Sequence, residues 1–470
     1  MIASAEAVSY PHAVGPIGEP IRLYDGEFEL RRAGVIFLGY GYVEFVWFPS
    51  PGFHFKFDLV RGDPQDPAAE LKQDQEIPLL SLFDEDPPIF IRFPDHAIGP
   101  KVRLRGYQAP NAFSGTLEGE QHFGDDVPIS SLSFYLANGP RLIDESDDDP
   151  YSAIPALEDK GWRVTFEVVA DLGERLKTLK ASSGYTIAQV GRLVRTDGST
   201  FRAHEGVQLV DALAWFLSFA NGDWVGPLLP VGYDESGKRL EIWRAWKITH
   251  WRRTDSWFPV TAASQYDDKG QLGNPLAELI PCFMRRWSVS VSNETLQTAI
   301  HWYIEAGHDA GGLEGAIILT QTALELMASA MVVEDRRLLS AQGLASLPVF
   351  EQFRLLFGIA SLPVTSDELP QVKGFLSADN NWIDTPKALT EVRNAIIHSG
   401  KRSAQKIRTV KQVLPRAAEI YLWYLELIIL NFIGYEGLYD NRLAAIRGYW
   451  GPYENVPWRR QEANEPSLPG

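Results

Sequence analysis

The chain has a single cysteine, Cys282, among its 470 residues. One thiol excludes an internal disulfide and any zinc site built from several thiolates, and it favours a reducing compartment. The first residues contain no basic segment followed by a long apolar run, so we predict no secretory signal. These absences together predict a cytoplasmic protein.

Long uncharged apolar runs are also missing. The best candidate for a membrane span, residues 421–435, contains Glu426 and is shorter than the roughly 18 uncharged residues that a spanning helix needs. We therefore predict that this segment is a core helix and that the protein makes no membrane contact.

Basic charge is scarce, since 44 lysines and arginines face 61 acidic residues and leave a net charge of −17. A broad nucleic-acid-binding surface needs a basic field, so this balance speaks against one. It still permits an enzyme that contacts RNA at one basic cleft.

Several motifs that bind phosphate, metal or acyl substrates are absent. The sequence has no glycine-rich phosphate loop that ends in Lys-Ser/Thr and no Gly-x-Ser-x-Gly elbow. His301 and His308 are seven residues apart without a Glu-x-x-His motif, and the acidic run 141–150 lacks the spacing of a calcium loop. We predict no metal and no cofactor.

The length predicts two or three domains, and the residue patterns predict an α+β protein. Residues 1–142 form the first predicted domain, a β-rich sandwich or barrel, because segments such as 54–59 alternate between apolar and polar residues. Gly39 and Gly41 interrupt one of these strands, which suggests a bend or bulge there.

The middle and C-terminal parts have different periodicities. Residues 150–285 mix strand patterns with a helical pattern, which predicts a mixed domain. From 290 to 470 apolar residues recur at helical spacing, which predicts a bundle of antiparallel helices. Pro415 should kink or split the long closing helix.

One short stretch of this helical region combines the side chains that acid–base chemistry requires. Arg393, Asn394 and His398 fall in the last turns of a predicted helix that Asp384 caps and Gly400 ends. Asn394 and His398 share a face, whereas Arg393 lies about 140° round the helix from His398. The three side chains can therefore flank one groove.

The segment around these residues is basic, unlike the rest of the chain. Between Asp384 and Arg416, eight basic residues outnumber two acidic ones. Lys401 and Arg402 directly follow the helix and are predicted to bind substrate. A solvated basic helix face remains the alternative explanation.

The Arg-Asn-x-x-x-His pattern near a helix end, with further long apolar helices, resembles the signature of the HEPN superfamily. The tail 435–442 and the run 218–227 are similar to segments of its Apea-like branch of abortive-infection proteins. The resemblance implies a C-terminal helical bundle and a metal-independent endoribonuclease whose active site is completed by a second subunit. It also implies a toxin-like role in antiviral defence, with a phage-derived or other trigger at the N-terminal region.

The chemistry of these residue types fits that implication. Histidine exchanges protons near neutral pH, and arginine is a planar donor to phosphate. We predict that His398 is the base or acid, that Arg393 clamps the scissile phosphate and that Asn394 orients one of them. The alternatives are a non-catalytic dimerising protein whose β-rich region binds a protein or nucleotide, and a capped helix end without chemistry.

Two carboxylates interrupt apolar helical runs in the same region. Glu325 and Glu426 must be paired or hydrogen-bonded if they are buried, and either could then hold Arg393. The other interpretation, which we favour, places each glutamate on the polar edge of its helix.

Overall fold

The computed structural model describes most of the chain. The described residues are 15–32, 35–60, 87–94, 99, 101–108, 112–123, 127–139, 157–169, 171–244, 246–252, 256–258, 275–308, 311–398, 404–446 and 453–459. Two compact units emerge: Met1–Gly139 with Tyr151–Ala214 and Val225–Arg252, and Pro140–Pro150 with Trp215–Trp224 and Arg253–Gly470.

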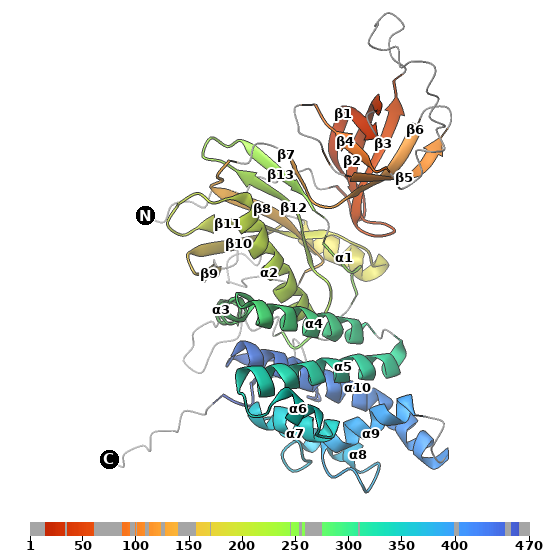
Figure 1. The fold of residues 1–470 in the computed structure, drawn as a ribbon, viewed down its shortest axis with the longest axis vertical. Helices are drawn as coiled ribbons and strands as arrows, with labels where there is room; N and C mark the ends of the chain where they lie inside the picture. Colours follow the sequence, from red (N-terminus) through yellow and green to blue (C-terminus); the bar gives the residue numbers. More distant parts are fainter. Residues whose placement is uncertain are drawn as a thin grey trace, which may run out of the picture. The chain divides into compact units, whose positions relative to one another are not determined.

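Six antiparallel strands of the first unit close into a barrel in the order β1-β2-β3-β6-β5-β4 (Figure 1). The barrel closes where β1 pairs with β4 and sets Leu30 opposite Ile91. The order β4-β1-β2-β3 is that of a Greek key. The strands are β1 (Ile21–Arg32), β2 (Val35–Val46), β3 (Gly52–Leu59), β4 (Ile89–Arg92), β5 (Lys101–Gln108) and β6 (Ala112–Glu118).

Alternation along these strands fills the barrel with aromatic rings. Phe53, Phe55 and Phe57 of β3 are buried, while Lys56 and Asp58 between and beside them are exposed. A period of two is what a strand with one buried face requires. The predicted α+β fold with a β-rich N-terminal region is thus confirmed, and the closed form is a barrel.

Gly39 and Gly41 have a different role from the predicted one. The pairing of β2 with β3 continues through both residues without a register shift, so the predicted bulge is wrong. A Cβ atom at Gly41 would lie 2.0 Å from the carbonyl oxygen of Lys56, and one at Gly39 would lie 2.4 Å from that of Asp58. Glycine is required here because the neighbouring backbone leaves no room for a side chain.

The substitution Gly41→Ala is expected to lower the free energy of unfolding by about 1–3 kcal/mol, because the clash is with backbone that is held in the sheet. Denaturation followed by tryptophan fluorescence measures this, since Trp47 is buried in the same core. The control is Gly52→Ala, whose Cβ would lie 4.0 Å from the nearest atom. Equal denaturation midpoints for the two variants would contradict the prediction.

The first unit also contains a seven-stranded sheet in the order β7-β13-β12-β8-β11-β10-β9 (Figure 1). Its strands are β7 (Gln121–Phe123), β8 (Ser131–Ala137), β9 (Leu157–Asp159), β10 (Trp162–Val168), β11 (Ile187–Arg195), β12 (Gly226–Tyr233) and β13 (Arg239–Trp243). Strands β7 and β8 thus pair with strands of the predicted middle domain. The division into 1–142, 150–285 and 290–470 stays a prediction.

Both faces of the central strand β8 are covered, so all seven of its residues are buried. Tyr135 and Ala137 belong to the same apolar core as the barrel phenylalanines. On the opposite face, Gly206 of α2 (Ala203–Asn221) lies close to Leu132 and Leu193. A second helix, α1 (Leu172–Ser182), contributes Leu172 to the barrel-side core.

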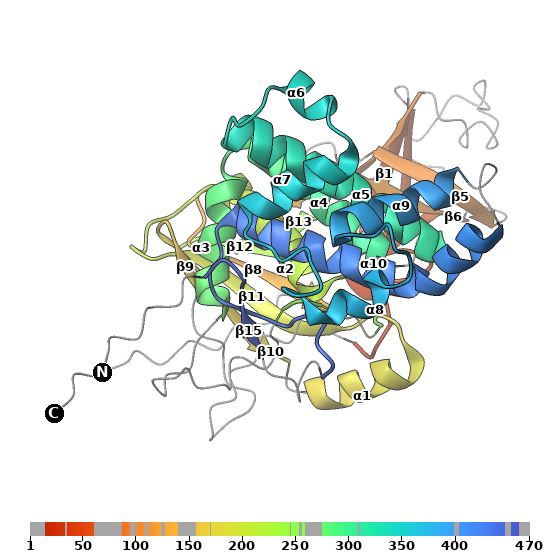
Figure 2. The same ribbon diagram turned by 90° about the horizontal axis from the view of Figure 1, so that it is seen from below.

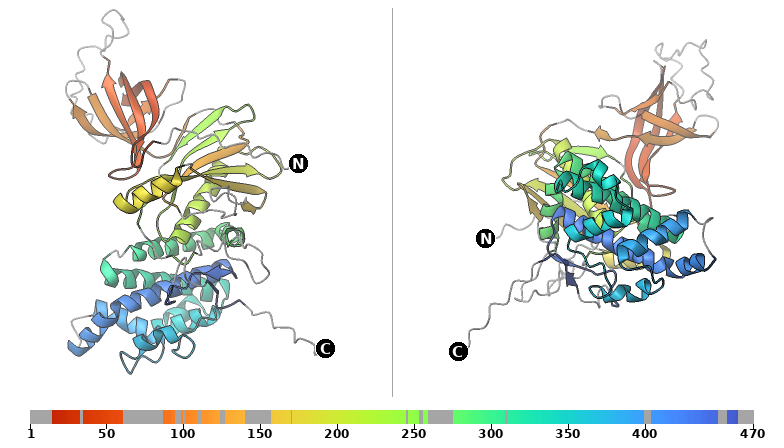
Figure 3. Two further views of the ribbon diagram at one scale, coloured as in Figure 1. Left: turned by 180° about the vertical axis from the view of Figure 1, so that it is seen from behind. Right: turned by 60° about the horizontal axis from the view of Figure 1, so that its bottom comes forward.

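The second unit is a bundle of helices, as the sequence predicted (Figures 1 and 2). Its central helix α5 contacts α4, α7, α9 and α10. Both views of Figure 3 show the helices of this unit packed together. The helices are α3 (Pro275–Trp287), α4 (Ser290–Gly307), α5 (Gly312–Ala328), the π-helix η2 (Ser329–Asp335), α6 (Ala341–Ala345), α7 (Val349–Ile359), the 3₁₀ turn η3 (Pro370–Val372), α8 (Lys373–Leu376), α9 (Thr385–Ile397) and α10 (Ala404–Ile433); a short ribbon, β14 (Leu438–Tyr439) with β15 (Glu454–Asn455), follows.

Helix α10 is continuous with Pro415 inside it, so the proline does not split it into two helices. The predicted core helix 421–435 corresponds to the end of α10, where nearly every side chain is buried. In the part of the chain described, one helical stretch, Gly312–Asp335, is long and apolar enough to cross a membrane. Its most apolar window is 61% buried inside the bundle, as in the core helix of a soluble protein.

Candidate functional site at the end of helix α9

Local chemistry sets both ends of α9, the helix that carries the candidate site. Asp384 caps its first turn, as predicted, by accepting a hydrogen bond from the Lys387 backbone N–H at 2.9 Å. At the other end the backbone N–H of His398 donates to the Asn394 carbonyl at 3.0 Å. His398 is therefore the C-cap residue, so its side chain lies where the helix ends.

The three predicted catalytic side chains differ in their exposure. His398 is exposed, whereas Arg393 and Asn394 are half-buried. The Arg393 Nη1 donates to the Asn394 Oδ1 at 3.3 Å, and the prediction that Asn394 orients Arg393 or His398 stays a prediction. A single chain places the three residues at one helix end. Among the described residues, no hydrogen bond joins Arg393 or Asn394 to His398.

The Arg393 side chain is half-buried. Its Nε is buried and has no hydrogen-bond acceptor within the described part of the chain. A buried donor without an acceptor is unfavourable, and a guanidinium in this state gains free energy from a new acceptor. Lys401 and Arg402, the predicted substrate-binding residues, lie outside the described residues.

A chain of three polar groups lies next to Arg393. The Tyr421 hydroxyl donates to Gln321 Oε1 at 2.8 Å, and Gln321 Nε2 donates to Glu325 Oε1 at 2.7 Å. Burial raises the pKa of the Tyr421 hydroxyl well above its ordinary value; the positive charge of Arg393 opposes this rise and the negative charge of Glu325 adds to it. Arg393 and Glu325 thus lie near the same hydroxyl.

Glu426 does not hold Arg393 and does not lie on a polar edge. It is 1% exposed, accepts a hydrogen bond from the Tyr303 hydroxyl at 2.7 Å and forms an ion pair with Arg442. Burial and, secondarily, the charge of Glu426 raise the pKa of Tyr303 well above its ordinary value. The edge interpretation is wrong for Glu426, which is the centre of a buried structural network.

The run 218–227, to which the sequence assigns no chemical role, contains the end of α2, a short turn and the start of β12, and α4 anchors the turn. His308 Nε2 lies 2.6 Å from Asp223 Oδ1, and the Trp224 indole donates to Glu305 Oε1 at 3.0 Å. His301 packs near the Trp224 ring, 5.7 Å between centroids. The described residues hold no group of three or more histidine, cysteine or acidic side chains that could bind a metal ion.

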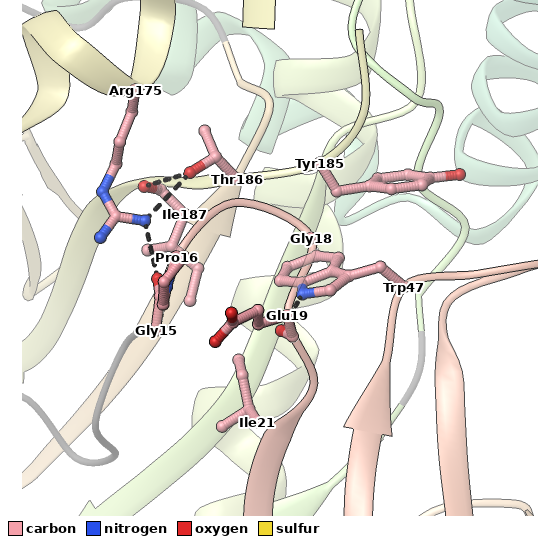
Figure 4. Close-up of a pocket in the computed structure, with 10 residues that line it drawn as sticks. All are labelled: Gly15, Pro16, Gly18, Glu19, Ile21, Trp47, Arg175, Tyr185, Thr186 and Ile187. Carbon is pink, nitrogen blue, oxygen red and sulfur yellow. Dashed lines mark hydrogen bonds between the residues drawn. The ribbon is translucent and has the colours of Figure 1, made fainter. Parts of the chain in front are cut away.

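A small cavity in the first unit has no room for a substrate (Figure 4). Its volume of about 10 Å³ is no more than one water molecule needs. Arg175 crosses it and donates to the Gly15 carbonyl and the Thr186 hydroxyl, both at 3.2 Å. These bonds tie the segment before β1 to the sheet, so we interpret the cavity as structural.

Comparison with known proteins finds two domain families that match parts of this chain. Residues 124–254 match the YopA central domain family, and residues 290–454 match the YopA C-terminal domain family. The chain is also similar to the SPbeta prophage-derived uncharacterized protein YopA of Bacillus subtilis (strain 168). That relative is 25% identical over 456 residues, which are 95% of this chain and 97% of the relative. No solved structure matches the chain.

The second match spans α4 to β15 almost completely, and it includes Arg393, Asn394 and His398. Its start at residue 290 coincides with the first residue of α4. The candidate site thus lies in the part of the chain that matches the YopA C-terminal domain family.

Proposed function

We propose that this protein is a metal-independent endoribonuclease of the HEPN type that acts as a cytoplasmic homodimer. The observation that carries the proposal is the end of α9, where a half-buried arginine held by Asn394 and an exposed histidine occupy the last turns of one helix. Arg393 can bind a phosphate, and His398 can exchange protons with solvent or substrate.

The proposed reaction is transfer of the RNA phosphate to the neighbouring 2′-hydroxyl. A histidine takes the 2′-hydroxyl proton, the 2′-oxygen attacks phosphorus, and the 5′-oxygen leaves after it is protonated by an acid. Arg393 stabilises the charge on the phosphate oxygens in the transition state. The products are a 2′,3′-cyclic phosphate and a 5′-hydroxyl, and no metal takes part.

A second subunit accounts for the distance between the two side chains. Arg393 and His398 are separated by about 7.5 Å along the helix and about 140° round it. One reacting phosphate is contacted more readily by residues from two copies of α9 that face each other. Lys401 and Arg402 then extend the basic surface toward the RNA backbone, as the sequence predicts.

The proposed biological role is a regulated, toxin-like effector of antiviral defence. It rests on the resemblance to Apea-like abortive-infection proteins, and the prophage origin in the name of the Bacillus relative fits competition between phages. In this proposal the β-rich unit responds to a phage-derived or other trigger and controls the bundle.

A non-catalytic binding protein is the second candidate, and the outer face of β2 favours it. Ile36, Leu38 and Tyr40 are 44%, 50% and 53% exposed along one side of this strand. A row of exposed apolar side chains on a barrel is a surface that a protein ligand can cover. In this case the bundle only dimerises and RNA stays intact.

Cleavage of labelled RNA by the purified full chain in EDTA tests the proposal. Wild-type protein is expected to cut and to leave cyclic phosphate ends. Arg393→Ala should lower the rate by about 10²–10³-fold, because it removes the donor to the developing charge. Arg393→Lys should restore little, since an ammonium group cannot replace a planar guanidinium at a bidentate site.

Arg336→Ala is the matched control, because Arg336 is an exposed arginine of the same unit. It should cleave like wild type. Cleavage that survives Arg393→Ala would rule out the assigned site. Intact RNA with every variant, in the presence of a phage lysate as trigger, would favour the binding protein.

A further inference from the structure

Four neighbouring strands of the barrel carry one row of side chains on its outer face (Figure 1). Tyr42 of β2 pairs with Lys56 of β3, and Lys56 pairs with Ser114 of β6. Arg105 of β5 is the extra residue of a bulge beside Ser114. Lys56 and Arg105 are exposed, while Tyr42 and Ser114 are half-buried. Because only β6 separates β3 from β5, the backbones of these two strands lie about 10 Å apart.

Two basic groups lie at the ring of Tyr42. The guanidinium carbon of Arg22 is 3.5 Å from the ring centroid, and the Lys56 Nζ is 5.9 Å from it. Both distances are within the range of a cation–π interaction. Arg22 also forms ion pairs with Asp25 at 2.9 Å and with Glu44 at 3.6 Å. The ring and the guanidinium thus form a fixed pair, and the charges of Asp25 and Glu44 are engaged by Arg22.

Lys56 and Arg105 form no ion pair with any carboxylate among the described residues. Glu118 of the intervening strand β6 pairs instead with Arg103 at 2.9 Å and with Lys101 at 3.4 Å. The charge of Glu118 is therefore engaged, whereas the positive charges of Lys56 and Arg105 are free to bind a ligand. In a chain with a net charge of −17, two such charges on one face attract an anion to that face.

We propose that this surface, the Tyr42 face made by Arg22, Tyr42, Lys56 and Arg105, binds single-stranded RNA. A base stacks on the pair of Arg22 and Tyr42, and Lys56 and Arg105 contact neighbouring phosphates. Every base has a π-face, so the Tyr42 face accepts many sequences. The choice of RNA as the ligand rests on the proposed function. The face itself consists of residues of the first unit and takes no part in the cleavage chemistry.

A second tyrosine of β2 provides a matched comparison. Tyr40 is 53% exposed and lies two residues from Tyr42 on the same side of the strand. It pairs with Glu27 of β1 and with Asp58 of β3, and both of these acidic residues are exposed. Their negative charges repel a phosphate, so Tyr40 offers an aromatic ring without the basic surroundings of Tyr42.

Fluorescence anisotropy of a labelled 2′-O-methyl oligouridylate of about 12 nucleotides tests the proposal with the full chain. This probe stays intact, because its 2′-oxygens are methylated and cannot attack phosphorus. Lys56→Gln combined with Arg105→Gln should lower the affinity about tenfold and reduce the salt dependence by about 0.7 per lost phosphate contact. Tyr42→Leu should lower the affinity about five- to hundredfold, because it removes a stacking surface.

Two control variants should bind the probe like wild type. Lys177→Gln combined with Lys180→Gln removes the same number of charges from exposed positions of α1. Tyr40→Leu removes an exposed tyrosine from the same strand. Unaltered melting of all variants shows that the fold is intact. Wild-type protein that does not bind the probe, or equal affinities of the Tyr42→Leu and Tyr40→Leu variants, would overturn the proposal.

Binding and cleavage separate this inference from the proposed function. Binding that depends on Tyr42, Lys56 and Arg105, without cleavage of ordinary RNA by any variant, would support the Tyr42 face and reject the ribonuclease. Cleavage by wild type, with equal affinity of the Lys56/Arg105 variant and its α1 control for the probe, would reject the Tyr42 face and leave the ribonuclease standing.

Discussion

Arg442→Ala is expected to lower the free energy of unfolding of the helical unit by about 3–5 kcal/mol, the usual cost of removing one partner of a buried ion pair. The substitution leaves the Glu426 carboxylate, which is 1% exposed, with a hydrogen bond from the Tyr303 hydroxyl to its Oε1. One neutral hydrogen bond does not compensate a buried charge. Denaturation monitored by circular dichroism at the helical signal measures the loss.

Two variants make this prediction specific to the buried charge. Tyr303→Phe removes one hydrogen bond from the same carboxylate and should cost about 1–2 kcal/mol. Arg336→Ala removes an exposed arginine and should stay within about 0.5 kcal/mol of wild type. If Arg442→Ala cost no more than Arg336→Ala, the network around Glu426 would not stabilise the bundle.

The order of strands and helices could be predicted, because apolar residues recur at the period of any strand or helix that buries one face. Alternation at 54–59 predicts β3, and apolar residues at helical spacing predict the bundle. Closure of the barrel could not be predicted in this way. It depends on the pairing of β1 with β4, whose partners Leu30 and Ile91 are far apart in the chain.

Glycines show a second limit of sequence reasoning. An interrupted strand pattern at Gly39 and Gly41 fits a bulge and a close backbone approach equally well. Only the position of β3 decides between them, because the carbonyl oxygens of Lys56 and Asp58 occupy the space of a side chain. The two glycines can be seen in the sequence, but the reason that glycine is required lies in the neighbouring strand β3.

Partners of buried charges were the least predictable feature. The need of Glu426 for a partner follows from its apolar surroundings, yet Arg442 and Tyr303 come from different parts of the chain. Asp223 and His308 are likewise 85 residues apart. No spacing rule connects such residues, since they meet only when the helices have packed.

The candidate site at the end of α9 could be predicted only in part. The spacing of Asn394 and His398 and the cap at Asp384 are properties of one helix, so the sequence could predict them. The burial of the Arg393 Nε depends on how the helices pack, so the sequence could not predict it. Local geometry thus identifies the residues, and packing determines how far each of them is exposed.

His398→Ala is expected to lower RNA cleavage by about 10²–10⁴-fold, because it removes the group that transfers protons in the proposed reaction. His398 is exposed at the helix end, so its loss should leave the melting temperature unchanged. Single-turnover cleavage of labelled RNA measures the rate. If His398 transfers the proton, the pH profile of cleavage near neutral pH should change in the variant, because histidine is the side chain that ordinarily exchanges protons there.

His204→Ala provides the comparison, because His204 is an exposed histidine on a helix outside the candidate site. It should retain the wild-type rate and pH profile. A loss of cleavage with a shifted KM and an unchanged pH profile in His398→Ala would assign His398 to RNA binding rather than proton transfer. A rate that falls at unchanged KM while the pH profile changes is the result expected for proton transfer by His398.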